Sequence, residues 1–256
     1  MSVINTNVKS MFAQAALQTN ERSMTTAMNQ LSTGKRTYSA SVDAAGLSLS
    51  EKLTSQIRGS QMAARNMNDA ISFLQTAEGA LGEIANMAQR MYELAIQYAD
   101  GTLSTDQQTD IKSEMNELST AITSVKTNAK WNATATADYS ITTTVSGDGT
   151  TATFAKTTSI GTVPTSVSTA STIETFIETV ASQRGEAGAQ INRLGFMVDN
   201  LNNIATNLAA SRSRVQDTDY AKASAELART QIINQAATAM LAQANQQPQV
   251  VLSLLQ

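Results

Sequence analysis

Apolar and small residues recur every seven positions through a large part of the chain. From Met67 onward, one row of them is followed three places later by a second row, which is the a/d pattern of a helix that packs along another helix. Asp100-Gly101 is a turn signal that ends this helix, and Ser104 with Gln107 forms a capping box that begins the next one. Because the connection is short, we expect the two helices to lie antiparallel. The two rows are Met67, Leu74, Leu81, Ala88 and Ala95, and Ala70, Ala77, Ile84, Met91 and Tyr98.

The same spacing appears in two later segments. Apolar residues from Ile111 to Val125 predict the helix that follows the turn, and apolar residues from Val180 to Val215 predict a long helix that begins near residue 172. Together with the first segment, they predict a mainly α fold, a long antiparallel helical bundle or coiled-coil rod.

The segment 132–171 interrupts this helical pattern and is rich in Ser and Thr. Its apolar residues are spaced among β-branched threonines, and Gly147-Asp148-Gly149 and Pro164 punctuate them. This composition predicts a small β-rich central excursion with hairpins. A low-complexity linker is the alternative.

The two ends of the chain carry apolar residues at helical spacing but almost no charge. Lys9 is the one charged residue in 1–20, and no Asp, Glu, Lys or Arg occurs from Thr230 to Gln256. Such a helix is marginal on its own in water and leaves an apolar stripe exposed. We therefore expect the two ends to pair with each other and with copies from neighbouring molecules. Folding of both ends back onto the core of the same chain is the alternative.

Composition narrows the classes of function. The chain has no Cys and no His and a net charge of −3. It therefore lacks thiolate nucleophiles, imidazole bases and the usual zinc ligands, and we expect no enzyme, cofactor or metal site. The charge balance gives no basic surface for nucleic acid, and we expect no membrane span. The first residues have no apolar run behind a basic start, so we expect no cleaved secretory signal.

The residues near both ends resemble bacterial flagellins. Similar segments occur in the family's order at opposite ends of the chain, and weaker similarity extends inward from both sides. The segments are SVINTNVKSMFAQ (2–14), LSTGKRTYSASVDAAGLSLSEKLTSQIRG (31–59), QRMYELAIQYADGTLS (89–104) and NLAASRSRVQDTDYAKASAELARTQIINQAATAMLAQANQQPQVVLSLL (207–255).

The resemblance implies a hairpin-like molecule whose paired N- and C-terminal helices form the inner tube of a helical filament. It also implies a central variable region that is shorter than in many flagellins. The implied regions are a terminal coiled-coil inner-tube domain (1–33 and 220–256), a connecting spoke segment (34–57), a helical outer-tube domain (58–131 and 172–219) and a short Ser/Thr-rich variable region (132–171).

The function implied is a structural subunit that self-assembles into the bacterial flagellar filament for swimming motility. Flagellins leave the cell unfolded through the flagellar type III channel, which implies an extracellular location. The implied partners are further copies of the chain, an export chaperone, the filament cap and the hook-junction proteins. A hook–filament junction protein and a cytosolic coiled-coil binding module are the alternatives.

Two sets of residues are candidates for contacts. Arg90, Leu94 and Glu114 match family positions that contact Toll-like receptor 5, in a stretch that also helps to form the axial contact of the filament. The terminal helices supply the predicted assembly contacts, which are Ile4, Val8, Met11, Phe12, Ile233, Met240, Leu241, Val251, Leu254 and Leu255.

Overall fold

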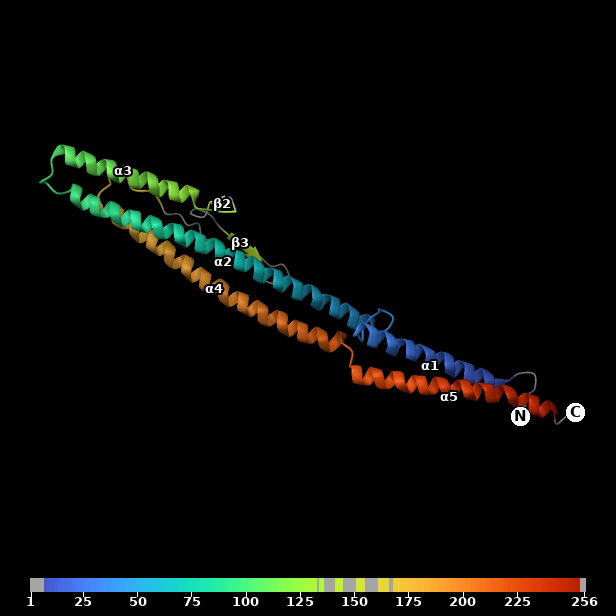
Figure 1. The fold of residues 1–256 in the computed structure, drawn as a ribbon. Helices are drawn as coiled ribbons and strands as arrows, with labels where there is room; N and C mark the ends of the chain where they lie inside the picture. The colour runs from blue at the N-terminus through green and yellow to red at the C-terminus, as the bar shows by residue number, and fades with distance from the viewer. Residues whose placement is uncertain are drawn as a thin grey trace. The chain divides into compact units, whose positions relative to one another are not determined.

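The computed structural model describes residues 7–132, 134–135, 141–144, 151–154, 161–165 and 168–253. Long helices make up most of this part of the chain, so the predicted mainly α fold class is confirmed (Figure 1). The elements are α1 (Val8–Thr33), α2 (Ala44–Tyr98), α3 (Thr105–Asn128), β1 (Lys130–Trp131), β2 (Thr134–Ala135), β3 (Ile141–Thr144), β4 (Thr151–Phe154), α4 (Ala170–Gln216) and α5 (Tyr220–Ser253).

The chain divides into two compact units. Unit 1 comprises Met1–Thr54 with Ala209–Gln256, and unit 2 comprises Ser55–Leu208. The divisions fall inside α2 and α4, so each of these helices contributes residues to both units.

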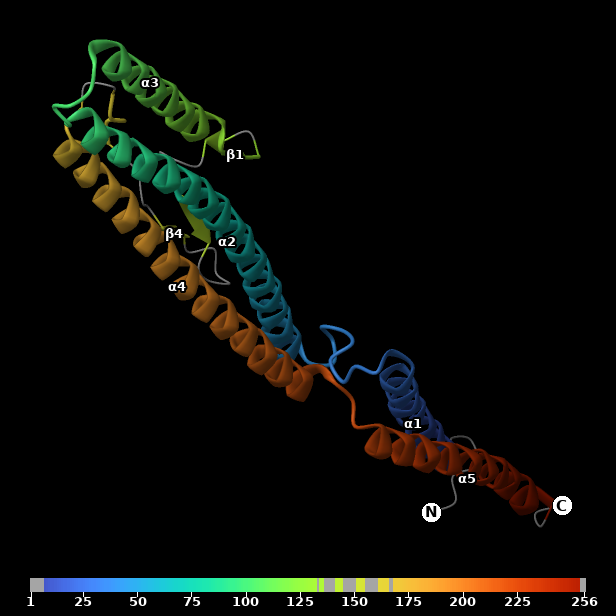
Figure 2. The same ribbon diagram turned by 60° about the vertical axis from the view of Figure 1, so that its left-hand side comes forward.

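Unit 2 is held together by large apolar side chains where α2, α3 and α4 lie alongside one another (Figure 2). The rows predicted from Met67 form its core, because Met67, Leu81, Ile84 and Met91 are all buried. One cluster joins α2 to α3 and to the first turns of α4, and a second joins α2 to α4 farther along. The heptad pattern therefore identified the core-facing sides of these helices.

The helix start predicted at Ser104 is confirmed by a complete capping box. The Gln107 N–H donates to Ser104 Oγ at 3.3 Å, and the Ser104 N–H donates to Gln107 Oε1 at 3.0 Å. These bonds satisfy backbone donors that have no partner inside α3.

The β-rich excursion is present as two short antiparallel pairs, β1 with β2 and β3 with β4. In the second pair the register runs from Ile141 opposite Phe154 to Thr144 opposite Thr151. Gly147-Asp148-Gly149, the predicted turn, lies outside the described residues.

Unit 1 is built around α1 and α5, which lie side by side and antiparallel (Figures 1 and 2). α2 begins at Ala44, so the later part of the segment 34–57, predicted as a connecting spoke, is helical. α5 continues through Pro248 to Ser253.

Candidate functional site

The contact between α1 and α5 is made by a mixture of small, polar and larger apolar side chains. Each helix has a row of buried or half-buried residues that recur at alternating intervals of three and four, as in a coiled coil, although a few other residues, such as Gln30 and Glu226, are also not exposed. We call these two rows the seam. The α1 row is Ser10, Ala13, Leu17, Asn20, Met24, Ala27 and Leu31, and the α5 row is Ala223, Leu227, Thr230, Asn234, Ala237, Leu241 and Ala244.

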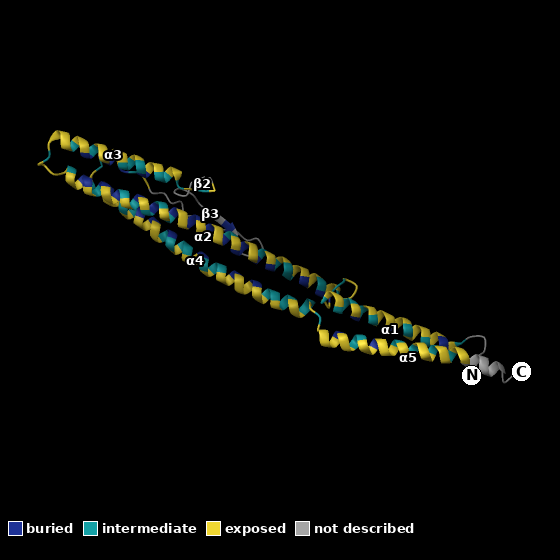
Figure 3. Ribbon diagram, viewed as in Figure 1, coloured by how far each residue is buried: buried dark blue, intermediate teal, exposed yellow. Residues whose placement is uncertain are grey.

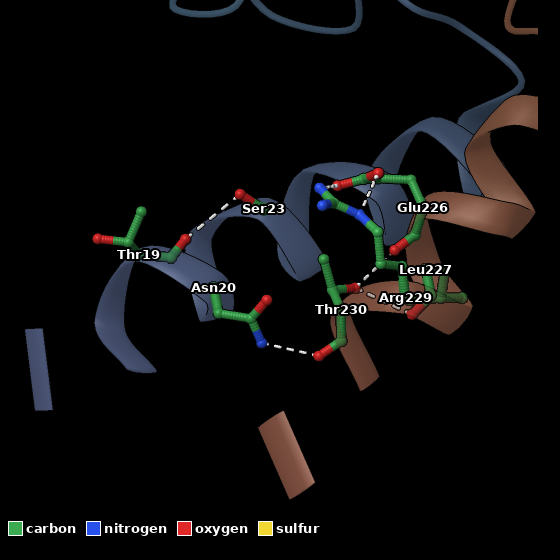
Figure 4. Close-up of polar contacts among 7 residues, drawn as sticks. All are labelled: Thr19, Asn20, Ser23, Glu226, Leu227, Arg229 and Thr230. Carbon is green, nitrogen blue, oxygen red and sulfur yellow. Dashed lines mark hydrogen bonds and ion pairs between the residues drawn. The ribbon is translucent and has the colours of Figure 1, made fainter. Parts of the chain in front are cut away.

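Two side-chain amides cross the seam. Asn20, of which 8% is exposed, donates from Nδ2 to the backbone carbonyl of Thr230 at 2.7 Å (Figure 4). Asn7 donates from Nδ2 to the carbonyl of Ala244 at 2.8 Å. A buried polar group costs free energy unless it is hydrogen-bonded, so these bonds offset the cost of placing amides in the seam.

The apolar residues predicted on α1 point away from the seam. Phe12 is 73% exposed and Met11 61%, and Val8 is also exposed. At 3.6 residues per turn, these three positions lie on the side of α1 opposite Ala13 and Leu17. The stripe read from the sequence is therefore not the face of α1 that contacts α5. We call it the outward face of α1.

α5 also exposes apolar residues outside the seam. Ile233 and Met240, both predicted, are exposed, whereas Leu241 is half-buried in the seam. Ile232, which the sequence reasoning missed, is 66% exposed and lies opposite the seam. Exposed residues follow most of α1 and α5 in Figure 3. Of the other predicted contacts, Ile4, Leu254 and Leu255 lie outside the described residues, and so does the side chain of Val251.

The sequence reasoning also missed the seam itself, although its signal is readable. Positions 10, 13, 17, 20, 24, 27 and 31 have the same alternating spacing as the rows of α2. They are occupied by Ser, Ala and Asn as well as by Leu and Met, so a pattern of apolar residues favours the stripe on the opposite side of α1.

The residues that follow α1 are hydrogen-bonded to the end of α4 and to the segment between α4 and α5. Gly34 caps α1 in the left-handed conformation, with φ 68°, and its carbonyl accepts the Thr218 N–H at 3.0 Å. The Arg36 N–H donates to the Gln216 carbonyl at 2.6 Å, and the Arg36 guanidinium donates to the Val215 carbonyl at 2.7 Å. A Cβ on Gly34 would lie 2.9 Å from the hydroxyl of Tyr220, so both the conformation and the space favour glycine here.

The charged residues of α5 lie in the first turns of this helix. Glu226 and Arg229 form an exposed ion pair of 2.7 Å (Figure 4). The hydrogen bond from Arg229 lowers the pKa of the Glu226 carboxyl, and the same bond raises the pKa of Arg229. A shallow hollow of about 320 Å³ beside this pair is lined by Arg22, Ser23, Thr26, Ala27, Gln30 and Glu226.

The predicted receptor contacts fall in unit 2 and differ in exposure. Arg90 lies on α2 and donates from Nε and Nη2 to Glu114 Oε1 on α3, at 3.0 and 2.9 Å. Arg90 also donates to Glu93, and the bond to Glu114 is the main cause of its raised pKa. Leu94, by contrast, is 2% exposed and belongs to the core. Leu94 therefore packs in the core of the free chain, and its contact with the receptor stays a prediction.

The residues that the structure describes form neither a metal-binding cluster nor a helix that could span a membrane. Within this part of the chain, no cluster of three or more His, Cys, Asp or Glu side chains could hold a metal ion. None of the described helices combines the length and the apolarity that a membrane crossing requires.

Comparison with known proteins identifies the family. The model for the bacterial flagellin N-terminal helical region matches residues 4–136, and the model for the C-terminal helical region matches residues 170–255. The chain therefore belongs to the bacterial flagellins, a family of structural proteins.

Relatives match over nearly their whole lengths. A flagellin of Halalkalibacterium halodurans is 38% identical, over 99% of each chain. A flagellin of Bacillus subtilis is 34% identical, over 98% of this chain and 99% of the relative. The flagellar filament 33 kDa core protein of Treponema phagedenis is also 34% identical, over 99% of each chain. Among solved structures, that of Bacillus cereus flagellin is 29% identical and covers 58% of this chain and 94% of that one, with a TM-score of 0.46.

Proposed function

We propose that this chain is a structural subunit that polymerises into the bacterial flagellar filament and so serves swimming motility. The observation that carries the proposal is the exposure of apolar side chains on both terminal helices of a chain that belongs to the flagellins. Phe12 on α1 and Ile232 on α5 lie outside the seam that joins the two helices. Further copies of the chain are the partners that would cover them.

Burial gives this association its driving force. Removing a large apolar side chain from water contributes roughly 1.5–3 kcal/mol. Each subunit exposes several such side chains on α1 and α5. Each time a subunit is added to the filament, its own set of these side chains would become buried. The polar seam holds the helix pair and leaves its apolar residues free for neighbours.

The roles of the regions follow from this proposal. Residues 1–33 and 220–256 form the inner tube, 34–57 the connecting spoke, 58–131 and 172–219 the outer tube, and 132–171 a short variable region. The hydrogen bonds between Arg36 and the last residues of α4 support the spoke role, because they hold together two distant parts of the chain.

The finer partners rest on membership of the family. We propose export through the flagellar type III channel, an extracellular location in the filament, and contacts with an export chaperone, the filament cap and hook-junction proteins. The names of the relatives, flagellin and filament core protein, favour a filament subunit over a junction protein or a cytosolic coiled-coil module.

A contact with the next subunit or with Toll-like receptor 5 is proposed for Arg90 and Glu114. Both side chains are about half exposed, and together they present a paired cation and carboxylate on neighbouring helices. The pair is accessible in the free chain, which such a contact requires.

Seeded polymerisation tests the proposal. Purified chain added to fragments of its own filaments should form filaments that sediment and are visible by electron microscopy. Phe12→Asp should abolish growth or raise the critical concentration at least 100-fold, because a carboxylate would be forced into an apolar contact at every addition step.

Phe12→Leu is the matched control, since it retains an apolar side chain at the same place, and it should polymerise at nearly the normal critical concentration. Normal filaments from Phe12→Asp would contradict the role of the outward face. Failure of the unaltered chain to extend its own seeds would overturn the proposed function.

A further inference from the structure

Asn7, the N-cap residue of α1, joins this helix to the last turns of α5. Asn7 donates from Nδ2 to the carbonyl of Ala244 at 2.8 Å. At its other end, Asn7 Oδ1 accepts the N–H of Ser10 at 3.1 Å and so caps α1. One amide therefore satisfies a backbone donor of its own helix and a backbone acceptor of the neighbouring helix.

The acceptor is an unusual one. In an α-helix the carbonyl of Ala244 normally accepts the N–H of the residue four places on, and that residue is Pro248. Proline has no N–H, yet α5 continues through Pro248 to Ser253. The Ala244 carbonyl consequently has no helical donor, and Asn7 supplies one from outside the helix.

A second amide bond lies along the same pair of helices. Asn20 donates to the carbonyl of Thr230, and this carbonyl keeps its place in the ordinary helical pattern of α5. The two bonds have nearly the same spacing along α1 as along α5, as one antiparallel register requires. The observed register therefore allows the bonds of Asn7 and Asn20 to form at the same time.

The rest of the seam specifies the register weakly. In the observed register Ala13 lies about opposite Ala237, midway between the two amide bonds. A slip of one heptad places Leu17 about opposite Leu241, an apolar pair that the seam accommodates. Heptad slips therefore keep the coiled-coil spacing and forfeit little apolar contact.

We propose that Asn7 and Pro248 act as one device that sets the register of α1 against α5. Pro248 removes the helical donor of the Ala244 carbonyl, and only the observed register brings Asn7 to that carbonyl. A slipped register moves Asn7 away from that carbonyl, which lies at a partly buried position and loses the donor that it has in the observed register. Asn20 adds a bond but discriminates less between registers, because it donates to a carbonyl that already has a helical partner.

The helix pair lies within one chain, so its register can be tested on the dilute chain. The pair need not be stably formed there, because a disulfide traps a register each time the two helices come together. The sequence has no Cys, so a pair of introduced cysteines gives an unambiguous disulfide. Ala13→Cys with Ala237→Cys reports the observed register, and Leu17→Cys with Leu241→Cys reports a slip of one heptad. Disulfide yields after brief oxidation are compared on non-reducing gels, where cross-links between chains separate by mass.

Asn7→Asp is the decisive variant, because a carboxylate still caps α1 but cannot donate to Ala244. It should raise the ratio of slipped to observed disulfide by about five- to tenfold. Asn7→Ser, a neutral residue that also caps helices but is shorter, should act in the same way.

Pro248→Ala tests the role of the proline. It returns a helical N–H to the Ala244 carbonyl, so by itself it should raise the ratio of slipped to observed disulfide. Adding Asn7→Asp to Pro248→Ala should then change this ratio by less than about twofold. An unchanged ratio in Asn7→Asp, or an equal change with and without Pro248→Ala, would overturn the proposal.

Discussion

The two units use the same helical spacing with different side chains. In unit 2 the contact positions hold large apolar residues such as Leu81, Ile84 and Met91, which are almost completely buried. In unit 1, among the described residues, the buried apolar side chains are those of Ala27 and Ala223. Spacing brings helices together in both units, but only unit 2 obtains a large apolar core from that contact.

This difference explains how the exposed apolar residues are distributed. The outward face of α1, with Met11 and Phe12, is available because a different face of α1 contacts α5. Helix pairs with so little buried apolar surface are marginal in water, since burial is what offsets conformational entropy. Unit 1 thus has the composition of a region that gains its stability from contacts with other copies.

The largest effect on the free chain is expected from a cavity in unit 2. Leu81→Ala removes a side chain that is 1% exposed at the centre of the cluster of α2, α3 and α4. Such a change should lower the free energy of unfolding by about 2–5 kcal/mol. Urea denaturation followed by circular dichroism measures the loss.

The same substitution in the seam sharpens the contrast. Leu17→Ala is chemically identical to Leu81→Ala, but Leu17 is only half-buried. It should change the main unfolding transition of the free chain by about 1 kcal/mol or less. Equal losses from the two variants would show that the helix pair is as firmly folded as unit 2, and would break the comparison.

A much smaller effect is expected from the ion pair of Glu226 and Arg229. The hydrogen bond from Arg229 holds the pKa of Glu226 below its ordinary value. The pair therefore contributes stability above the ordinary pKa of Glu, and this contribution is lost as the pH falls through the lowered value. Both side chains are exposed, so the contribution to stability is slight and screened by salt.

Carbon-detected NMR titration of the Glu226 carboxyl checks this cause. Arg229→Gln should return the pKa of Glu226 toward its ordinary value. A pKa that stays equally low in Arg229→Gln would mean that another group, such as Lys222, controls this carboxyl.

The helical architecture could be predicted from the sequence where large apolar residues mark the contacts. The rows from Met67 identified the core side of α2, and Ser104 with Gln107 identified the start of α3. The burial of Leu94 was harder to predict, because it lies outside the a and d rows. α2 packs against both α3 and α4, so it buries a broader face than one coiled-coil partner requires.

The assembly surface could be predicted only in part. The sequence identified Phe12 and Met240 as apolar residues of the terminal helices, but not which face of each helix meets its partner. That choice depends on Asn20 and Asn7, whose amides reach backbone carbonyls of α5. A backbone carbonyl occurs at every residue, so a pattern of side chains cannot reveal which one is used.

Hydrogen exchange of backbone amides, compared between the dilute chain and the filament, tests most directly whether unit 1 depends on neighbouring copies. We expect amides of α1 and α5 to exchange rapidly in the dilute chain and at least 100-fold more slowly in the filament. Amides in the buried turns of α2 around Ile84 should be protected in both states. Protection of α1 and α5 in the dilute chain equal to that of α2 would contradict the central claim, because it would show that the polar seam alone keeps the terminal helices folded.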